Sequence, residues 1–174
     1  MNTFALEIWD DECSKCIYYT VRWEYEEINE TDKFFTKYGD SKSTYLEHAQ
    51  IILRLITHSI GEKYRAIDDF FDRNKNNAQA LPPKPKQRIP EIEEIGIHFP
   101  LRLYCLRLQG NAVILFNGGI KDERTDQLSK DISLKFQEAQ QFVARIERAI
   151  RDGLLRIDKR GLITDFKGNT EIEI

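Results

Sequence analysis

Aromatic and β-branched residues are concentrated in short segments of the chain where apolar and polar positions alternate. Residues 3–9 and 16–24 are two such segments separated by a polar turn, and they predict an N-terminal β-hairpin. Residues 101–108 and 112–116 alternate in the same way on either side of residues 109–111, which predicts a second hairpin. These hairpins are the basis of an expected antiparallel sheet.

Apolar residues three and four positions apart predict helices elsewhere in the chain. Asn29 or Thr31 suits the N-cap of a short helix that ends at Gly39. Gly61 is expected to end the longer helix that follows, and Asp152-Gly153 the last one. In chain order, the expected helices are a short one through Phe34, Phe35 and Tyr38, one from Ser43 or Thr44 to about Ile60, one over residues 64–71, and a long one over residues 131–151.

Proline, asparagine and glycine mark the segments that are expected to be loops. Residues 74–90 hold four of the five prolines, which predicts a surface loop or a semi-rigid linker. Isoleucines within residues 92–97 are expected to lead from this loop into the hairpin as a further strand. Residues 117–119, Asn-Gly-Gly, predict a tight turn, and residues 154–157 and 161–164 predict two short strands in the tail.

The separation of strands and helices into blocks predicts an α+β fold, with helices packed on a mainly antiparallel sheet. A chain of 174 residues fits a single domain over residues 1–174. A domain of this size buries enough surface to fold without disulfides or a metal ion.

The charge of the chain limits how it can interact with nucleic acid. Its formal net charge of −3 argues against a protein that coats nucleic acid through bulk electrostatics. Residues 73–90 nevertheless carry cations and no acidic residue, so a local anion-binding surface is compatible with the sequence. No apolar run reaches the roughly 18 residues of a membrane span, and no signal peptide is expected, which favours a cytoplasmic protein.

Cys13 and Cys16 have the two-residue spacing found in zinc sites and in thiol redox motifs. The acidic residues around them disfavour the thiolate that redox chemistry requires, and no second cysteine pair follows. An ordinary polar turn is therefore the preferred interpretation, and we expect no metal site and no cofactor. The three histidines, His48, His58 and His98, form no ligand motif.

Arg102 and Tyr104 lie two residues apart in the predicted hairpin and so share one face of the strand. Lys121 follows the glycine-rich segment after the second strand. An arginine beside a tyrosine suits contacts with a phosphate and a base. The same residues are also common on the solvent face of antiparallel strands, so both interpretations stay open.

Residues 99–123, FPLRLYCLRLQGNAVILFNGGIKDE, resemble the RelE/ParE/HigB superfamily of bacterial toxins, including its phage-derived relatives. The resemblance implies a RelE-like core, to which the N-terminal hairpin and the long helix would be additions. It also implies that Arg102 and Lys121 contact phosphate and that Tyr104 stacks on a base or handles a proton.

Two hypotheses follow. The first is a toxin-like, RelE-type endoribonuclease that acts on mRNA, on the ribosome, with an antitoxin protein as partner. The second is a non-catalytic protein–protein interaction module that retains a toxin-like fold and binds a partner or forms a homodimer through the long helix. Convergence of Arg102, Tyr104 and Lys121 on one exposed concave surface would favour the first. Its additional RNA-binding residues are expected to be Lys63, Arg65, Lys84, Lys86 and Arg88.

Overall fold

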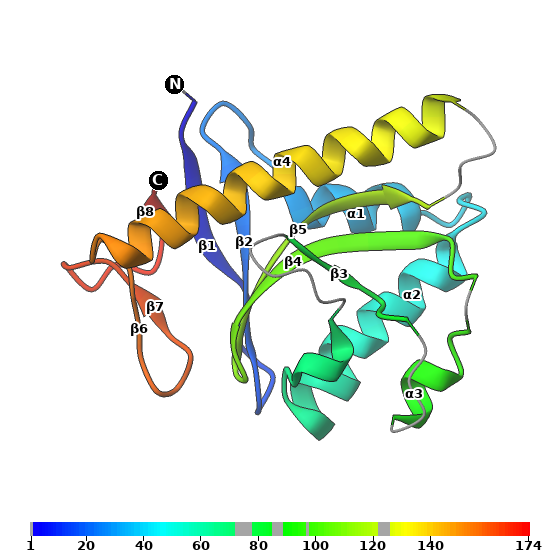
Figure 1. Ribbon diagram of the computed structural model, residues 1–174, viewed down its shortest axis with the longest axis horizontal. Helices are drawn as coiled ribbons and strands as arrows, with labels where there is room; N and C mark the ends of the chain where they lie inside the picture. The colour runs from blue at the N-terminus through cyan, green and yellow to red at the C-terminus, as the bar shows by residue number, and fades with distance from the viewer. Residues whose placement is uncertain (1, 72–77, 85–88, 97, 122–125) are drawn as a thin grey trace.

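The computed structural model describes residues 2–71, 78–84, 89–96, 98–121 and 126–174 (Figure 1). Over these residues the fold is α+β, as predicted, with helices on both faces of a six-stranded sheet. From one edge to the other, its strands are β3 (Gln79–Leu81), β4 (Leu101–Gln109), β5 (Ala112–Ile120), β2 (Ile17–Trp23), β1 (Phe4–Asp10) and β8 (Ile172–Glu173).

The sheet is mixed, and the expected antiparallel pairing holds between all its neighbouring strands but one. Strand β2 runs parallel to β5, while the other neighbouring strands pair antiparallel. Both predicted hairpins, β1–β2 and β4–β5, are confirmed, but the first lies inside the sheet and is not an addition at its edge. Strand β5 lies in the interior of the sheet, and its residues 112–119 are all buried, as is typical of a central strand covered on both faces.

Two separate layers of helices cover the sheet. The first helices of the chain pack on one face, where Phe34 of α1 is buried against Tyr18 and Leu103 of the sheet. Helix α4, which crosses the sheet in Figure 1, packs on the other face, where its Phe142 is buried against Phe4. The helices are α1 (Glu30–Tyr38), α2 (Leu46–Arg54), the π-helix η1 (Leu55–Tyr64), the 3₁₀ helix η2 (Asp68–Phe70), α3 (Pro90–Glu93) and α4 (Asp126–Arg151).

The second expected helix changes its geometry where the first hairpin packs against it. It begins at Leu46, later than predicted, and continues past Gly61 as a π-helix. Gly61 does not end it. A Cβ at this position would lie 2.5 Å from the Sγ of Cys13, so glycine allows the β1–β2 turn to approach. The Tyr18 hydroxyl donates to the Ile56 carbonyl oxygen at 2.7 Å in the same region.

Three further local predictions are wrong. The helix expected over residues 64–71 is only the short η2, since Phe70 and the extended Phe71 are both fully buried. Of the isoleucines expected to form a strand, Ile92 lies in α3, because Pro90 suits the first position of a helix, and Ile95 lies in the turn after it. Ile97 lies outside the described residues. The Asn-Gly-Gly segment at residues 117–119 is part of β5 and not a turn.

The C-terminal tail contributes to two sheets. Strands β6 (Arg156–Ile157) and β7 (Ile163–Thr164) form the predicted pair, whereas β8, which was not predicted, extends the main sheet beside β1. The Tyr19 hydroxyl fixes this tail by donating to the Gly161 carbonyl oxygen at 2.9 Å.

Candidate functional site

A cavity of about 310 Å³ lies at the end of the β4–β5 hairpin, where β4 begins and β5 ends. Antiparallel pairing brings Arg102 opposite Gly119, and the Lys121 amide donates to the Pro100 carbonyl oxygen at 2.6 Å. Residues 82–84 reach the cavity because they follow β3, whose last residue, Leu81, pairs with Leu103 of β4. The residues that line the cavity are Pro82, Pro83, Lys84, Gly96, Phe99, Arg102 and Lys121.

Three cationic side chains therefore meet in this cavity: Lys84, Arg102 and Lys121. A hydrogen bond orients the Arg102 side chain, because its guanidinium donates to the Pro82 carbonyl oxygen at 3.0 Å. Each of the three also interacts with other groups of the chain. Among the described residues that line the cavity none is acidic, so its lining is suited to an anion such as phosphate.

Tyr104 lies outside the cavity. It shares the strand face of Arg102, as predicted, but this face carries α4, and the Tyr104 ring packs against Phe136 with centroids 5.3 Å apart. Burial raises the pKa of Tyr104, while the nearby Arg102 lowers it by a smaller amount. The structure thus brings two of the three predicted catalytic residues together and places the third beneath a helix.

Lys63 and Arg65 lie at the other end of the hairpin. The Ala66 amide donates to the Gly110 carbonyl oxygen at 2.9 Å, so this segment is next to the β4–β5 turn. At the usual rise of a strand, the length of β4 separates it from Arg102 by roughly 25 Å. The Lys63 ammonium lies 2.7 Å from a Glu91 carboxylate oxygen. Lys86 and Arg88 lie outside the described residues.

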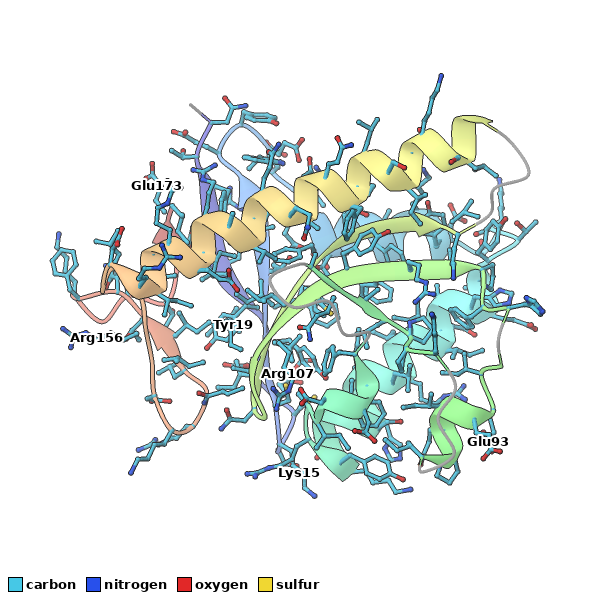
Figure 2. All side chains as sticks on the ribbon, in the orientation of Figure 1. Lys15, Tyr19, Glu93, Arg107, Arg156 and Glu173 are labelled. Carbon is cyan, nitrogen blue, oxygen red and sulfur yellow. The ribbon has the colours of Figure 1, made fainter. Side chains whose placement is uncertain are left out.

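Other cations near the β4–β5 turn are also held by the protein itself. Figure 2 labels Lys15 and Arg107 in this region. The Lys15 ammonium donates to the Lys63 carbonyl oxygen at 3.0 Å, and the Arg107 guanidinium lies 3.3 Å from the Asp68 carboxylate. Unlike the described lining of the cavity, this end of the sheet thus has acidic side chains beside its cations.

Phe99 is a candidate that the sequence analysis did not identify. Its ring lines the cavity beside Arg102 and Lys121, and an edge-on contact with His48 at 5.2 Å positions it. The Nδ1 atom of His48 is buried and has no hydrogen-bond partner among the described residues. Position 99 directly precedes Pro100 and the hairpin, but nothing in its sequence context shows that it faces the cations.

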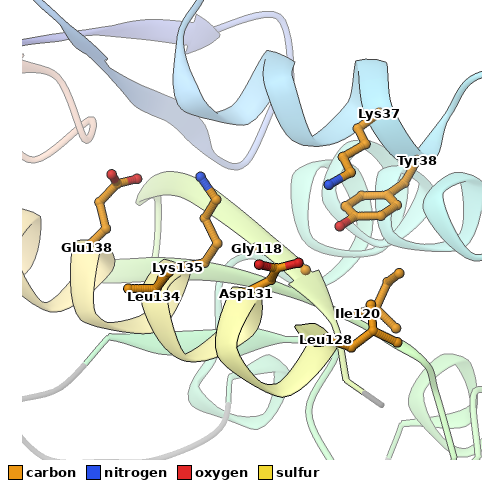
Figure 3. Close-up of a pocket in the computed structure, with 10 residues that line it drawn as sticks. Lys37, Tyr38, Gly118, Ile120, Leu128, Asp131, Leu134, Lys135 and Glu138 are labelled. Carbon is orange, nitrogen blue, oxygen red and sulfur yellow. The ribbon is translucent and has the colours of Figure 1, made fainter. Parts of the chain in front are cut away.

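A second hollow, also about 310 Å³, lies between α1 and α4 above the last residues of β5 (Figure 3). In contrast to the cavity, it is lined by side chains of both charges. We refer to it as the α1–α4 groove. Its lining residues are Lys37, Tyr38, Gly118, Gly119, Ile120, Leu128, Asp131, Leu134, Lys135 and Glu138.

The cysteine pair does not have the properties of a redox site. Cys13 and Cys16 are free thiols. Burial and then Asp10 raise the pKa of Cys13 to about 11, and burial raises that of Cys16 to about 12. Both thiols are thus protonated at neutral pH, as the acidic surroundings of Cys13 predicted.

Within the described part of the chain, no group of three or more His, Cys, Asp or Glu residues is arranged to hold a metal ion. No described helix is both long enough and apolar enough to cross a membrane. The chain matches no protein-family model, no curated protein and no solved structure.

Proposed function

We propose that this protein binds single-stranded RNA at the cavity of Lys84, Arg102 and Lys121 and acts as a toxin-like, RelE-type endoribonuclease. The observation that supports the proposal is the convergence of these three cations, from separate segments, on one cavity. A cavity of this size is at the lower limit for small-ligand sites, which suits one nucleotide and not a duplex.

Each lining group has a role in this proposal. Arg102 presents a planar fork that matches phosphate oxygens, and Lys121 and Lys84 add positive charge. Phe99 offers an aromatic surface to a base, as in many single-strand sites. In cleavage, the 2′-oxygen would attack the adjacent phosphorus as its proton passes to solvent, and the bond from phosphorus to the 5′-oxygen would break. The products would be a 2′,3′-cyclic phosphate and a 5′-hydroxyl protonated from solvent, and the cations would stabilise the additional negative charge of the transition state. A cytoplasmic location, ribosome-bound mRNA and an antitoxin partner belong to the same proposal.

The second candidate is a non-catalytic interaction module. Two observations favour it: the packing of Tyr104 against Phe136, and the ion pair that holds Lys63 to Glu91. Both remove a predicted RNA-contacting group from a surface that is free to bind. The module would use the same fold to bind a protein partner.

Induced expression tests the two candidates directly. We expect wild-type protein to arrest growth and cleave mRNA, and the Arg102→Ala/Lys121→Ala variant to do neither. The matched control is Arg156→Ala/Lys159→Ala, which removes the same charge from exposed positions in the tail and should behave as wild type.

Binding of purified protein to a single-stranded RNA oligonucleotide tests RNA binding separately from RNA cleavage. RNA binding without cleavage would overturn the nuclease and keep the RNA site. Soluble wild-type protein that neither binds RNA nor impairs growth would overturn the proposal and leave the interaction module.

A further inference from the structure

The last residues of β5 have an open edge inside the α1–α4 groove. Strand β2 pairs with β5 only over residues 112–115, and beyond Thr20 it continues beside β1 alone. Residues 116–120 of β5 therefore have β4 on one side and, among the described residues, no strand on the other. The sheet thus forks where β2 leaves β5.

Side chains satisfy the β5 backbone at the apex of this fork. The Thr31 hydroxyl of α1 lies 3.0 Å from the Leu115 carbonyl oxygen and 3.1 Å from that of Phe116. The Gly118 amide donates to the side-chain oxygen of Asn117 at 2.7 Å. The open part of the edge therefore begins at the Gly118 carbonyl.

The hydrogen bonds between β5 and β4 show which backbone groups face the groove. The Lys121 amide donates to β4, and residues that bond across an antiparallel pair alternate with residues that do not, so Gly119 bonds with Arg102. The Gly118 carbonyl and the amide and carbonyl of Ile120 consequently point away from β4, and both residues line the groove. Within the described part of the chain, these three groups have no hydrogen-bond partner.

The two helices that border the groove lie on opposite faces of the sheet. A Cβ at Gly119 would lie 3.7 Å from Ile132, so α4 packs directly on one face of this end of β5. Tyr38 of α1 is buried in the core on the other face, where Ile120 also packs. Figure 3 shows Gly118 and Ile120 between the two helices. The groove therefore lies in the plane of the sheet, in the position of a further strand beside β5.

We propose that the α1–α4 groove binds an extended peptide segment of a partner protein, which adds a strand to the sheet beside residues 118–120. Unpaired backbone groups at a sheet edge bind a strand through main-chain hydrogen bonds, while contacts with alternate side chains give specificity. Leu134, which is 62% exposed, offers an apolar contact to one such side chain. Asp131 and Glu138 also line the groove, and these acidic residues disfavour the phosphates of a nucleic acid. The inference does not depend on the RNA-binding proposal.

The length of the groove suits a short segment. Its lining along α4 extends from Leu128 to Glu138, which is about 15 Å at the rise of an α-helix. An extended chain covers this distance in about five residues. A peptide slightly longer than this is therefore sufficient to test the inference.

Peptide display on the full chain provides the test. The probe is a library of random peptides of about eight residues, displayed on phage and selected on the immobilised wild-type protein. We expect peptides with a Kd on the order of 10 μM, and we expect Leu134→Arg, which places a charged side chain in the groove, to weaken their binding about tenfold or more. Leu154→Arg, at a residue that is 55% exposed in the tail, is the matched control and should bind as wild type.

Two measurements on the wild-type complex do not depend on how the variants fold. N-methylation of alternate peptide amides should weaken binding about tenfold or more at one set of positions and little at the other, because only alternate amides of an added strand face β5. The Ile120 amide should gain about tenfold or more protection from hydrogen exchange on binding, whereas the Gly119 amide, which already faces β4, should not change.

Four results would overturn the inference. They are a library that yields no binder, equal binding by Leu134→Arg and wild type, equal effects of methylation at both sets of positions, and unchanged exchange of the Ile120 amide in the complex.

Discussion

The cationic cavity and the carboxyl cluster around Glu30 both lie near the final segment of β5, but they differ in the charges of the side chains that they bring together. Gly118, Gly119 and Ile120 line the groove next to the cluster, and Lys121, one residue further, lines the cavity. Both assemble charged side chains from segments far apart in sequence. In the cavity the charges of the described lining residues are all positive, whereas the cluster mixes carboxyl and ammonium groups.

This difference decides what each region can bind. An open cavity lined with cations attracts an anion from solution, and phosphate matches the fork of an arginine. Glu30, by contrast, is buried next to its own counterion, Lys33, which is in turn paired with Glu26. The net charge of −3 conceals both, because it averages over regions of opposite sign.

The largest effect is expected from Gly118→Ala, which affects the strand that the two regions share. A Cβ on Gly118 would overlap the Arg102 carbonyl oxygen and would lie 2.8 Å from its carbonyl carbon, so β4 and β5 would have to separate. We expect a loss of about 3 kcal/mol or more in the free energy of unfolding, measured by denaturant. Gly110→Ala is the control, since nothing lies within 4 Å of a Cβ there. Equal stability of both variants would contradict the close approach.

The next effect is the pH dependence that Glu30 contributes to stability. Because its pKa is raised from 4.5 to about 7, the folded protein holds a proton that the unfolded chain releases over this range. Stability from this group is complete below pH 4.5, decreases as the pH rises to about 7, and is constant above it. The loss is on the order of 3 kcal/mol. Unfolding of wild type and Glu30→Gln at several pH values should show this difference, and parallel curves would refute it.

A smaller effect is expected for a single cation of the cavity. Arg102→Ala should weaken binding of a single-stranded RNA about tenfold, equivalent to about 1.4 kcal/mol. The slope of log affinity against log salt should decrease by about 1, because one phosphate contact is lost. Arg156→Ala removes an exposed arginine of the tail and should change neither quantity. Identical losses in the two variants would show that RNA responds only to total charge.

Local signals predicted much of the fold. Asn29 does cap α1, since its side-chain oxygen accepts from the Asp32 amide at 2.8 Å, and Gly39 follows the last residue of the helix. The alternation in residues 101–108 correctly placed Arg102 and Tyr104 on one face. These features depend on neighbours along the chain, which a sequence displays directly.

The errors arose where distant segments decide the structure. Asn-Gly-Gly favours a turn, yet Gly118 is required because the β4 backbone passes close to it. Tyr104 has the pattern of an exposed strand residue, but α4 crosses its face. Glu30 and Glu138 belong to helices far apart in the chain, so no local pattern predicts that Glu138 raises the pKa of Glu30.

The smallest effect is expected at Lys63, and it tests whether the cations near the β4–β5 turn take part in binding. Glu91 already holds the Lys63 ammonium at 2.7 Å, and exposed ion pairs of this kind contribute little. Lys63→Ala should therefore leave RNA affinity and its salt dependence unchanged in a binding titration, and Glu91→Gln is the matched control. If Lys63→Ala weakened binding as much as Arg102→Ala, RNA would have to follow the whole length of β4. The single-nucleotide cavity would then be only part of a longer interface, and the contrast between the two ends of the hairpin would no longer hold.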